Sequence, residues 1–554
     1  MVVLGIHDGT HDAGAAVVAD GVLVAACSEE RFTREKGAGG WPARSIAACL
    51  AQVGEADVVA FPGFVNPNPA LRGARVVQRR FKLDGGWFYK EDAGPLGRLS
   101  EWLQFQSPFP NMRSDGRAAR ALAPALRALL RRDSRGLGGR VDVHDHHRCH
   151  AATAYATGGQ DDALVIVADG VGDGLALTVW RGRDGALQPL ATMPYPHSYG
   201  LLYATITGFC GFRPFRHEGK ITGLAALGNA DAVDVPFPFE GPVTDRRFTQ
   251  RFGAPLRPWL ARLRPYRRED VAAWLQRGVE AELAAIAAHW LRETGLRHVA
   301  LAGGLFANVR LNQRLAALDL DTLWVFPHMG DGGLAAGAAL LSAGARPYAM
   351  ADAFLGPPPE DPEPALRAAG VRYRRCQDLE EQVAERLAAG RIVARFEGAM
   401  EYGPRALGHR SILASGADPR MTDRLNLALS RSEFMPFAPA MLAEEADAWV
   451  DGLAPVRRAA AFMTVTAQAR ANLAAGCPAA VHADGSLRPQ LVSSGSLHRV
   501  LRRFHALTGV PAVVNTSFNL HEEPIVRTAA EAVETWRKAR IDALAIGEFL
   551  VEAA

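Results

Sequence analysis

The sequence predicts an α/β protein of two domains, and three observations point to this fold class. Apolar runs that end in Asp-Gly occur twice, at residues 2–9 and 164–170, and each is followed by a second β-rich run. Two later segments, 298–312 and 324–344, each have the pattern of a buried strand, a glycine-rich turn and a helix. Residues 347–364 are rich in proline and acidic side chains, which is typical of a domain boundary.

The length of 554 residues exceeds what one hydrophobic core supports. We therefore expect a first domain over residues 1–346, a linker over 347–364 and a second α/β domain over 365–554. The repeated openings indicate a duplicated α/β unit, as in the actin-like ATPase fold with its two RNase H-like halves and a ligand between them. Residues 63–140 are rich in arginine and aromatic side chains, so we expect an inserted, mostly helical segment there.

Local signals define the first elements of the chain. Residues 2–32 predict three strands, and Asp20-Gly21 is a strong hairpin signal between the second and third. A helix is expected from about Pro42 to Leu50. The landmarks of the second domain are GRIVARFEGAMEYGPRALGHRS, FMPFAP and VPAVVNTSFNLHEEPIV.

Composition excludes several function classes. A net charge of +3 is too small to argue for binding to nucleic acid or a membrane surface. The six cysteines form no CxxC pair, so we expect neither a disulfide framework nor a zinc ribbon. The chain opens on a strand-like run and has no apolar run long enough to span a bilayer. We therefore expect a cytoplasmic protein with no secretory signal and no membrane partner.

Two histidines and two aspartates form a candidate metal site. His146 and His150 are four residues apart, which on a helix places both rings on one face. Asp169 and Asp331 lie beside glycines at predicted strand ends, where close approach is easy. Two imidazoles and two carboxylates with open positions suit iron, zinc or manganese. The alternative is that the histidines are solvated or capping residues, because this spacing often arises by chance.

Glycine-rich turns offer a second candidate site. Gly303 and Gly304 precede a predicted helix, where free backbone N–H groups favour phosphate. Lys220 is one of only five lysines in an arginine-rich chain, which hints that a compact ammonium is needed there. The alternative is that these glycines serve packing.

The second domain has its own polar set of arginines, hydroxyls and amides near strand ends. Such a set suits a polyphosphate or an acyl phosphate. For any single arginine, a surface ion pair is the alternative. The residues are Arg405, Arg410, Arg431, Arg488, Asn515, Ser517 and Asn519.

The motifs together resemble the NodU/CmcH-type O-carbamoyltransferases, the family that includes the tobramycin carbamoyltransferase. The resemblance covers essentially the whole chain, and it is carried by HDGTHDAGAAVV, SEERFTREKG, HHRCHAATAYA, ADGVGDG, EGKITGLA, LAGGLFAN, GDGGLAAGAAL, EYGPRALGHRSILA and TGVPAVVNTSFN. It implies an actin-like first domain with a metal site and a YrdC-like second domain. It also implies that the second domain makes carbamoyl-adenylate from carbamoyl phosphate and ATP. The first domain would then transfer the carbamoyl group to a hydroxyl of a small molecule such as an antibiotic-type natural product.

The resemblance also assigns roles to residues. The metal, usually iron but with zinc, manganese or magnesium as alternatives, would be held by His146, His150, Asp169 and Asp331. His11, beside Asp12 in the opening motif, would be the base that deprotonates the acceptor hydroxyl. Adenylate would lie against Lys220, Gly223, Gly303, Gly304 and Asn308. The phosphates in the second domain would be bound by Arg405, Arg410, Arg431, Arg488, Ser517 and Asn519.

This chain departs from the family pattern at several positions. Leu429 and Met435 stand where relatives have a lysine and an arginine, which weakens the cationic set. Glu522 replaces the glycine of a GEPIV motif, and His409 replaces an asparagine. Two other functions stay open, namely a tRNA-modifying threonylcarbamoyl transfer enzyme and a non-catalytic nucleotide-binding regulator. We expect no nucleic-acid partner, and a homodimer is compatible with the sequence although nothing in it argues for one.

Overall fold

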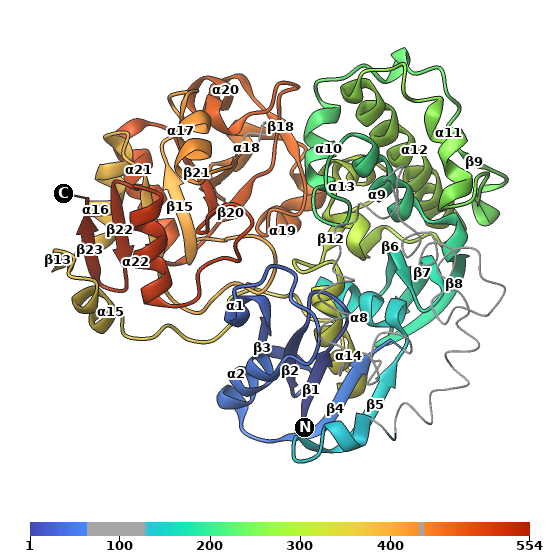
Figure 1. The fold of residues 1–554 in the computed structure, drawn as a ribbon, viewed down its shortest axis with the longest axis horizontal. Helices are drawn as coiled ribbons and strands as arrows, with labels where there is room; N and C mark the ends of the chain where they lie inside the picture. Colours follow the sequence, from blue (N-terminus) through green and yellow to red (C-terminus); the bar gives the residue numbers. More distant parts are fainter. Residues whose placement is uncertain (64–127, 129, 432–436, 554) are drawn as a thin grey trace. The chain divides into compact units, whose positions relative to one another are not determined.

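The computed structural model describes residues 1–63, 128, 130–431 and 437–553, and it divides into two compact units (Figure 1). Unit 1 comprises Met1–Val24 and Gly39–Met350, and unit 2 comprises Ala25–Ala38 and Ala351–Ala554. Most of the predicted inserted segment, residues 64–127, lies outside the described residues, so its helical character stays a prediction. No helix among those described is long and apolar enough to cross a membrane.

Unit 1 contains two five-stranded sheets that repeat one strand order. The first has the order β3-β2-β1-β4-β5 and the second the order β8-β7-β6-β11-β12. In both, the first strand pairs antiparallel with the second and parallel with the fourth. The duplication inferred from the two Asp-Gly openings is therefore present in the sheets. The strands are β1 (Val2–His7), β2 (Gly14–Ala19), β3 (Val22–Ser28), β4 (Ala56–Pro62), β5 (Gly138–His144), β6 (Ala163–Gly172), β7 (Leu175–Arg183), β8 (Ala186–Pro194), β11 (His298–Ala302) and β12 (Thr322–Val325).

The predicted local elements near the N-terminus are confirmed. Asp20 and Gly21 both have positive φ, 50° and 83°, as a two-residue hairpin turn requires. The helix expected from Pro42 is α2 (Ala43–Val53). The other main helices of unit 1 are α8 (His146–Gly158), α9 (Tyr199–Phe209), α10 (Glu218–Ala225), α12 (Arg268–Thr294), α13 (Val309–Ala316) and α14 (Leu334–Ala343).

Two helices of small residues pack closely at the centre of unit 1. Asp145 caps the start of α8, where its side chain accepts a hydrogen bond from the backbone N–H of Arg148. Helix α14 lies beside α8 and against β1. A Cβ on Gly337 of α14 would lie 2.1 Å from the carbonyl oxygen of Cys149, so only glycine permits this approach. The packing brings the start of α14 next to the first turns of α8.

Unit 2 is built on an eight-stranded mixed sheet with the order β13-β23-β22-β14-β15-β21-β16-β20. Helices α16 and α21 pack against each other, and their apolar side chains share a core with Val393, Leu413 and Val513 of the sheet. The strands are β13 (Tyr373–Arg375), β14 (Val393–Phe396), β15 (Arg410–Ala414), β16 (Ala438–Leu442), β20 (Gln490–Val492), β21 (Ala512–Ser517), β22 (Ala543–Ile546) and β23 (Phe549–Glu552). The main helices are α15 (Glu363–Ala368), α16 (Leu379–Ala388), α17 (Met421–Ala428), α21 (Gly495–Thr508) and α22 (Ala529–Lys538).

One early segment lies in the second unit rather than the first. The sequence placed all of residues 1–346 in one domain, but Ala25–Ala38 packs within unit 2. The backbone N–H of Ala26 donates to the carbonyl of Leu355 at 2.8 Å, so the end of β3 joins the chain that follows Met350. The α/β class of both units agrees with the prediction.

Candidate metal centre and anion site

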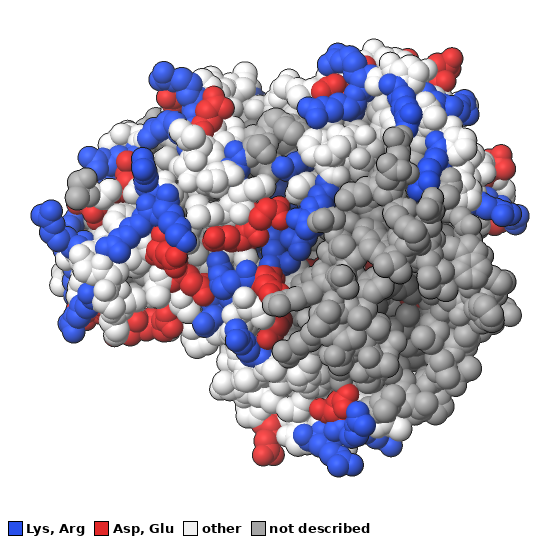
Figure 2. Space-filling view, in the orientation of Figure 1, with Lys and Arg blue, Asp and Glu red and all other residues white. Residues whose placement is uncertain are grey.

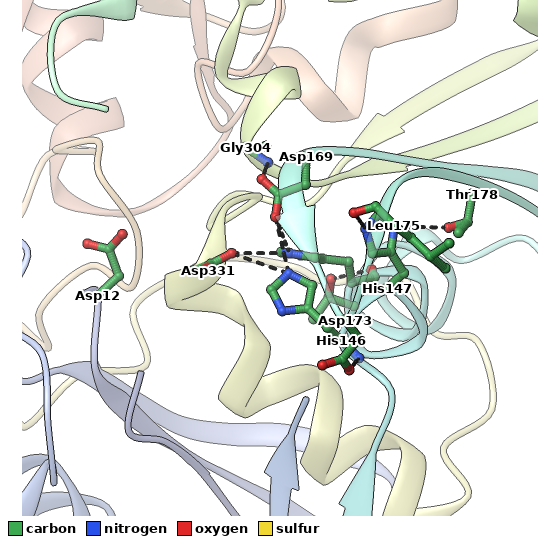
Figure 3. A network of polar contacts seen from close by, with 12 residues as sticks. Asp12, His146, His147, Asp169, Asp173, Leu175, Thr178, Gly304 and Asp331 are labelled. Carbon is green, nitrogen blue, oxygen red and sulfur yellow. Dashed lines mark hydrogen bonds and ion pairs between the residues drawn. The ribbon is translucent and has the colours of Figure 1, made fainter. Parts of the chain in front are cut away.

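The four predicted metal ligands come together in unit 1. One nitrogen of each histidine and one oxygen of each aspartate all lie within 4.8 Å of one another. Nε2 of His146 lies 3.1 Å from Asp169 and 3.5 Å from Asp331, and Nε2 of His150 lies 3.5 Å from Asp331. Figure 3 shows both carboxylates directed toward the His146 ring. The two aspartates and the two histidines of the HxxxH helix therefore lie together, as the sequence predicted.

Each ligand has a local reason for its place. Helix α8 puts His146 and His150 one turn apart on the same side of the helix. Asp169 lies where the pairing of β6 with β7 shifts register, and such bulges redirect side chains. Asp331 opens the short turn that leads into α14.

The residues fit a divalent cation. His146 and His150 are 1% and 0% exposed, and neither ring nitrogen of His150 has a hydrogen-bond partner in the described part of the chain. A buried imidazole without a partner is costly, and a cation between two imidazoles and two carboxylates would remove that cost. Burial opposes a charged Asp169, but the contacts and charges of His146 and His150 together outweigh this and hold the pKa of Asp169 well below its usual value. The ionised carboxylate favours a cation.

The four candidate ligands His146, His150, Asp169 and Asp331, called the quartet below, are held in place by neighbouring groups. The backbone N–H of His146 donates to Asp173 at 2.9 Å, and that of Gly304 donates to Asp169 at 3.2 Å (Figure 3). His147 points elsewhere, with its ring nitrogens 3.3 Å from the Thr178 hydroxyl and 3.1 Å from a backbone carbonyl. Of the three buried histidines on α8, His146 and His150 belong to the quartet, and His147 contacts β7.

His11 also reaches this centre. Its Nδ1 lies 3.0 Å from Asp12, and its Nε2 lies 3.7 Å from Asp331. The side chain is 57% exposed, so a substrate can reach it. Desolvation disfavours the charged ring, but the hydrogen bond and charge of Asp12 and the charge of Asp331 raise the pKa of His11 to about 9.

A further histidine was missed by the sequence reasoning. His7 ends β1, is 1% exposed, and has no hydrogen-bond partner for either ring nitrogen among the described residues. Burial lowers the pKa of His7 to about 4, although the charge of Asp331 acts on the ring in the opposite sense. The duplicated sheets offered a signal, because His7-Asp8-Gly9 aligns with Ala168-Asp169-Gly170.

The residues predicted to hold adenylate are spread over two elements of unit 1. Lys220 and Gly223 lie on α10, and the Lys220 ammonium is 6.0 Å from the Phe212 ring. Gly303 has a φ of 103°, and a Cβ there would lie 2.2 Å from the Ala168 carbonyl oxygen. Gly303 is therefore required for the turn that follows β11.

Asn308 has partners that connect it to α10. Its side chain caps α13, and it exchanges two hydrogen bonds with Gln276, at 2.8 and 3.1 Å. Gln276 accepts from the hydroxyl of Tyr203, which also bonds Thr222 of α10. This chain of hydrogen bonds fixes α10 relative to α13.

Unit 2 contains two neighbouring arginines that have no counter-ion among the described residues. Burial lowers the pKa of Arg405. Burial and the adjacent charge of Arg405 hold the pKa of Arg488 well below its usual value. Within the described residues neither guanidinium makes a hydrogen bond or ion pair, and Nε of Arg488 is buried without a partner. Two adjacent, partly buried cations of this kind favour the binding of an anion.

The loop that carries Arg405 is held by hydrogen bonds to its backbone. One carboxylate oxygen of Glu401 accepts the N–H groups of Leu407, His409 and Arg410 at 2.9–3.0 Å. Gln490 donates to the Leu407 carbonyl at 2.7 Å, and Asn515 donates to Gln490. The amide nitrogen of Asn515 supports the loop, and its predicted role in ligand binding stays a prediction. The sequence reasoning missed Glu401.

Two other predicted arginines use their donors inside the protein. Arg410 is 1% exposed and donates to the backbone carbonyls of Glu397, Gly398 and His409. Arg431 donates to side-chain oxygens of Thr516, Ser517 and Asn519 at 2.8–3.2 Å. Arg431, Ser517 and Asn519 are therefore brought together, whereas Arg410 fixes backbone.

Leu429 and Met435 are the two positions that depart from the cationic pattern of the family. Leu429 is fully buried. Met435 lies outside the described residues. The missing lysine is thus replaced by a core side chain.

Comparison with known proteins assigns both units. The family described as carbamoyltransferase N-terminus matches residues 126–236 and 242–340, and that described as carbamoyltransferase C-terminus matches residues 384–553. These matches define a group-transfer enzyme. The chain belongs to the carbamoyltransferase family.

Individual relatives are similar over most of their length. An uncharacterized protein of Synechocystis is 31% identical over 99% of this chain and 96% of its own. Nodulation protein NolNO of Sinorhizobium fredii is 30% identical over 98% of this chain and 79% of its own. Nodulation protein NolO of Bradyrhizobium diazoefficiens is 32% identical over 74% of this chain and 78% of its own. A crystal structure of T. kodakarensis HypF is 13% identical and covers 62% of this chain and 47% of its own. Its TM-score is 0.37, so the similarity is distant.

Proposed function

We propose that the protein is an ATP-dependent O-carbamoyltransferase. Unit 2, with a YrdC-like role, makes carbamoyl-adenylate from carbamoyl phosphate and ATP. Unit 1, as an actin-like domain, transfers the carbamoyl group to a hydroxyl of a small-molecule natural product in the cytoplasm. The proposal extends the family assignment to a mechanism and a class of acceptor.

The observation that carries the proposal is the pair Arg405 and Arg488. An acyl phosphate carries two negative charges, and arginine presents planar, paired donors that match phosphate oxygens. Since neither guanidinium has a carboxylate partner among the described residues, binding of the dianion would offset both their repulsion and their desolvation. Glu401 and Gln490 keep the loop in place without neutralising Arg405.

The first reaction balances with one water. Water cleaves carbamoyl phosphate to carbamate and phosphate. A carbamate oxygen then attacks the α-phosphorus of ATP, and pyrophosphate leaves as the carbamoyl-adenylate anhydride forms. In this step Arg405 and Arg488 bind the phosphate and orient the carbamoyl group beside it.

The second reaction uses unit 1. The acceptor oxygen bonds to the carbamoyl carbon, the bond from that carbon to the AMP oxygen breaks, and AMP leaves. His11 would take the hydroxyl proton at Nε2, while Asp12 fixes the ring through Nδ1. This role requires the neutral ring, so the raised pKa of His11 runs against it. His146, His150, Asp169 and Asp331 would hold the divalent cation, with Fe(II) preferred over zinc, manganese or magnesium, and this cation would polarise a carbonyl.

Adenylate in unit 1 would lie between α10 and the turn after β11. The hydrogen bonds from Thr222 to Asn308 support this arrangement, because they fix the two elements relative to each other. The residues proposed to face it are Lys220, Gly223, Gly303, Gly304 and Asn308.

The charge pattern favours a small acceptor over RNA. On the face in Figure 2, basic and acidic side chains of the described residues are interspersed. Binding to tRNA depends on a basic surface and falls steeply with salt. We therefore place the threonylcarbamoyl-type reaction second.

Mass spectrometry of the protein incubated with ATP and carbamoyl phosphate, without an acceptor, tests the proposal. Wild type and His146→Ala should form AMP or carbamoyl-adenylate with pyrophosphate, and Arg488→Met should not. The proposal fails if no sample consumes ATP, or if Arg488→Met is as active as wild type. Loss of the reaction in His146→Ala alone would place adenylate formation in unit 1.

A further inference from the structure

The segment Ala25–Ala38 reaches unit 2 with two arginines whose partners lie on the loops near Arg405. The segment continues from β3 and forms the short helix α1 (Glu30–Thr33). Neither Arg31 nor Arg34 has a role in the proposed reaction. Both nevertheless have their donors directed at backbone carbonyls of unit 2.

Arg31 holds the loop that carries Arg405. It is 5% exposed, and its Nη2 donates to the carbonyl of Gly403 at 2.9 Å. Gly403 has a φ of 133° and lies two residues before Arg405. Burial lowers the pKa of Arg31, while the charges of Glu30 and Glu401 act in the opposite direction. The Arg31 guanidinium therefore donates to the same loop whose backbone N–H groups donate to Glu401.

Arg34 holds a second loop of unit 2, at Pro524 and Ile525. Its Nη1 and Nη2 donate to the carbonyls of Ile525 and Pro524, both at 2.8 Å. Ile525 packs with Met400 and Ala406 in a small buried apolar cluster. Because Ala406 follows Arg405 directly, the position of the second loop affects the first.

We infer that Arg31 and Arg34 are positioning residues for the anion site, acting through the loops at Gly403 and Ile525. This inference rests on the proposed function. The charges of Arg405 and Arg488 repel each other, so the loop needs support that keeps Arg405 in place. Charge-assisted hydrogen bonds from Arg31 and Arg34 supply that support, and they leave Arg405 without a partner among the described residues.

Calorimetric titration of the full-length protein with inorganic phosphate tests the inference. Arg31→Met and Arg34→Met should each raise the Kd for phosphate by about tenfold or more, because the loop loses a charged donor. Arg31→Lys, which keeps one charged donor, should recover part of the affinity. Arg499→Lys is the matched control, since Arg499 is 62% exposed and pairs with Glu380 at the surface.

A second readout separates positioning from general instability. Hydrogen exchange of residues 401–410 should quicken in Arg31→Met while the core strand β21 stays protected. If Arg31→Met does not fold, Arg31→Lys and Arg34→Met decide the question.

Two outcomes overturn different claims. The inference is wrong if Arg31→Met and Arg34→Met bind phosphate like wild type while Arg405→Met does not bind it. The proposed function itself fails if Arg405→Met binds phosphate as tightly as wild type, because the arginine pair would then not be the anion site.

Discussion

Arg405 and Arg488 lie close enough for the charge of one to lower the pKa of the other, and no described carboxylate neutralises them. A fold selected only for stability would not retain such a pair. The arrangement makes sense if an anionic substrate supplies the missing charge. It also predicts a conflict between stability and binding at this site.

Substitution of Arg488 by Met should therefore stabilise the protein. We expect the free energy of unfolding to rise by about 1–3 kcal/mol, since a partly buried charge that has no partner among the described residues is removed at similar volume. Adenylate formation should be lost in the same variant. Urea unfolding measures the first effect, with Arg499→Met as a surface control that changes stability by less than about 0.5 kcal/mol. A destabilised Arg488→Met would show that Arg488 is a structural residue.

Removal of His150 should abolish metal binding. His150→Ala loses an imidazole that lies 3.5 Å from Asp331. We therefore expect elemental analysis to find stoichiometric metal in purified wild type and none in His150→Ala. A chelator should lower the Tm of wild type and leave that of His150→Ala unchanged. His147→Ala is the matched control, because His147 bonds Thr178 and a backbone carbonyl. Equal metal content in wild type and His150→Ala would rule out the quartet as the site.

The sequence predicted which four side chains lie together at the candidate metal centre better than it predicted the contacts of the arginines in unit 2, for a physical reason. Helical spacing puts His146 and His150 on one face, and a glycine-flanked aspartate at a strand end has few directions in which to point. An arginine is long, and its motif does not reveal whether carbonyls, as for Arg410, or a ligand will occupy its donors. The sequence did not reveal that Ala25–Ala38 belongs to unit 2, because β3 continues across the boundary at residue 25 as one strand.

Glu218 should make stability depend on pH. Burial raises the pKa of Glu218 to about 7. The folded protein thus keeps this proton up to about pH 7, whereas the unfolded chain releases it near pH 4.5. Protonation favours the folded state, so stability should fall as pH rises from about 4.5 to 7, by up to about 3 kcal/mol. In Glu218→Gln that part of the slope should disappear. An identical pH profile in wild type and Glu218→Gln contradicts the assignment.

Glu522 stands in a position that favours glycine. Its φ is 63°, which explains why the related motif has a glycine there. Glu522→Gly and Glu522→Ala both remove the carboxylate, but only the first removes the Cβ. We expect the Gly variant to be more stable than the Ala variant by about 1 kcal/mol in thermal unfolding. A more stable Ala variant would indicate that the backbone relaxes to negative φ without cost.

The central claim is that unit 2 activates the carbamoyl group on AMP through the arginine pair, independently of the metal centre. Exchange of labelled pyrophosphate into ATP, measured with and without carbamoyl phosphate, tests this most directly. The account predicts exchange that requires carbamoyl phosphate, is retained in His150→Ala and is lost in Arg488→Met. Exchange that persists in Arg488→Met, or that disappears in a folded His150→Ala, would contradict it.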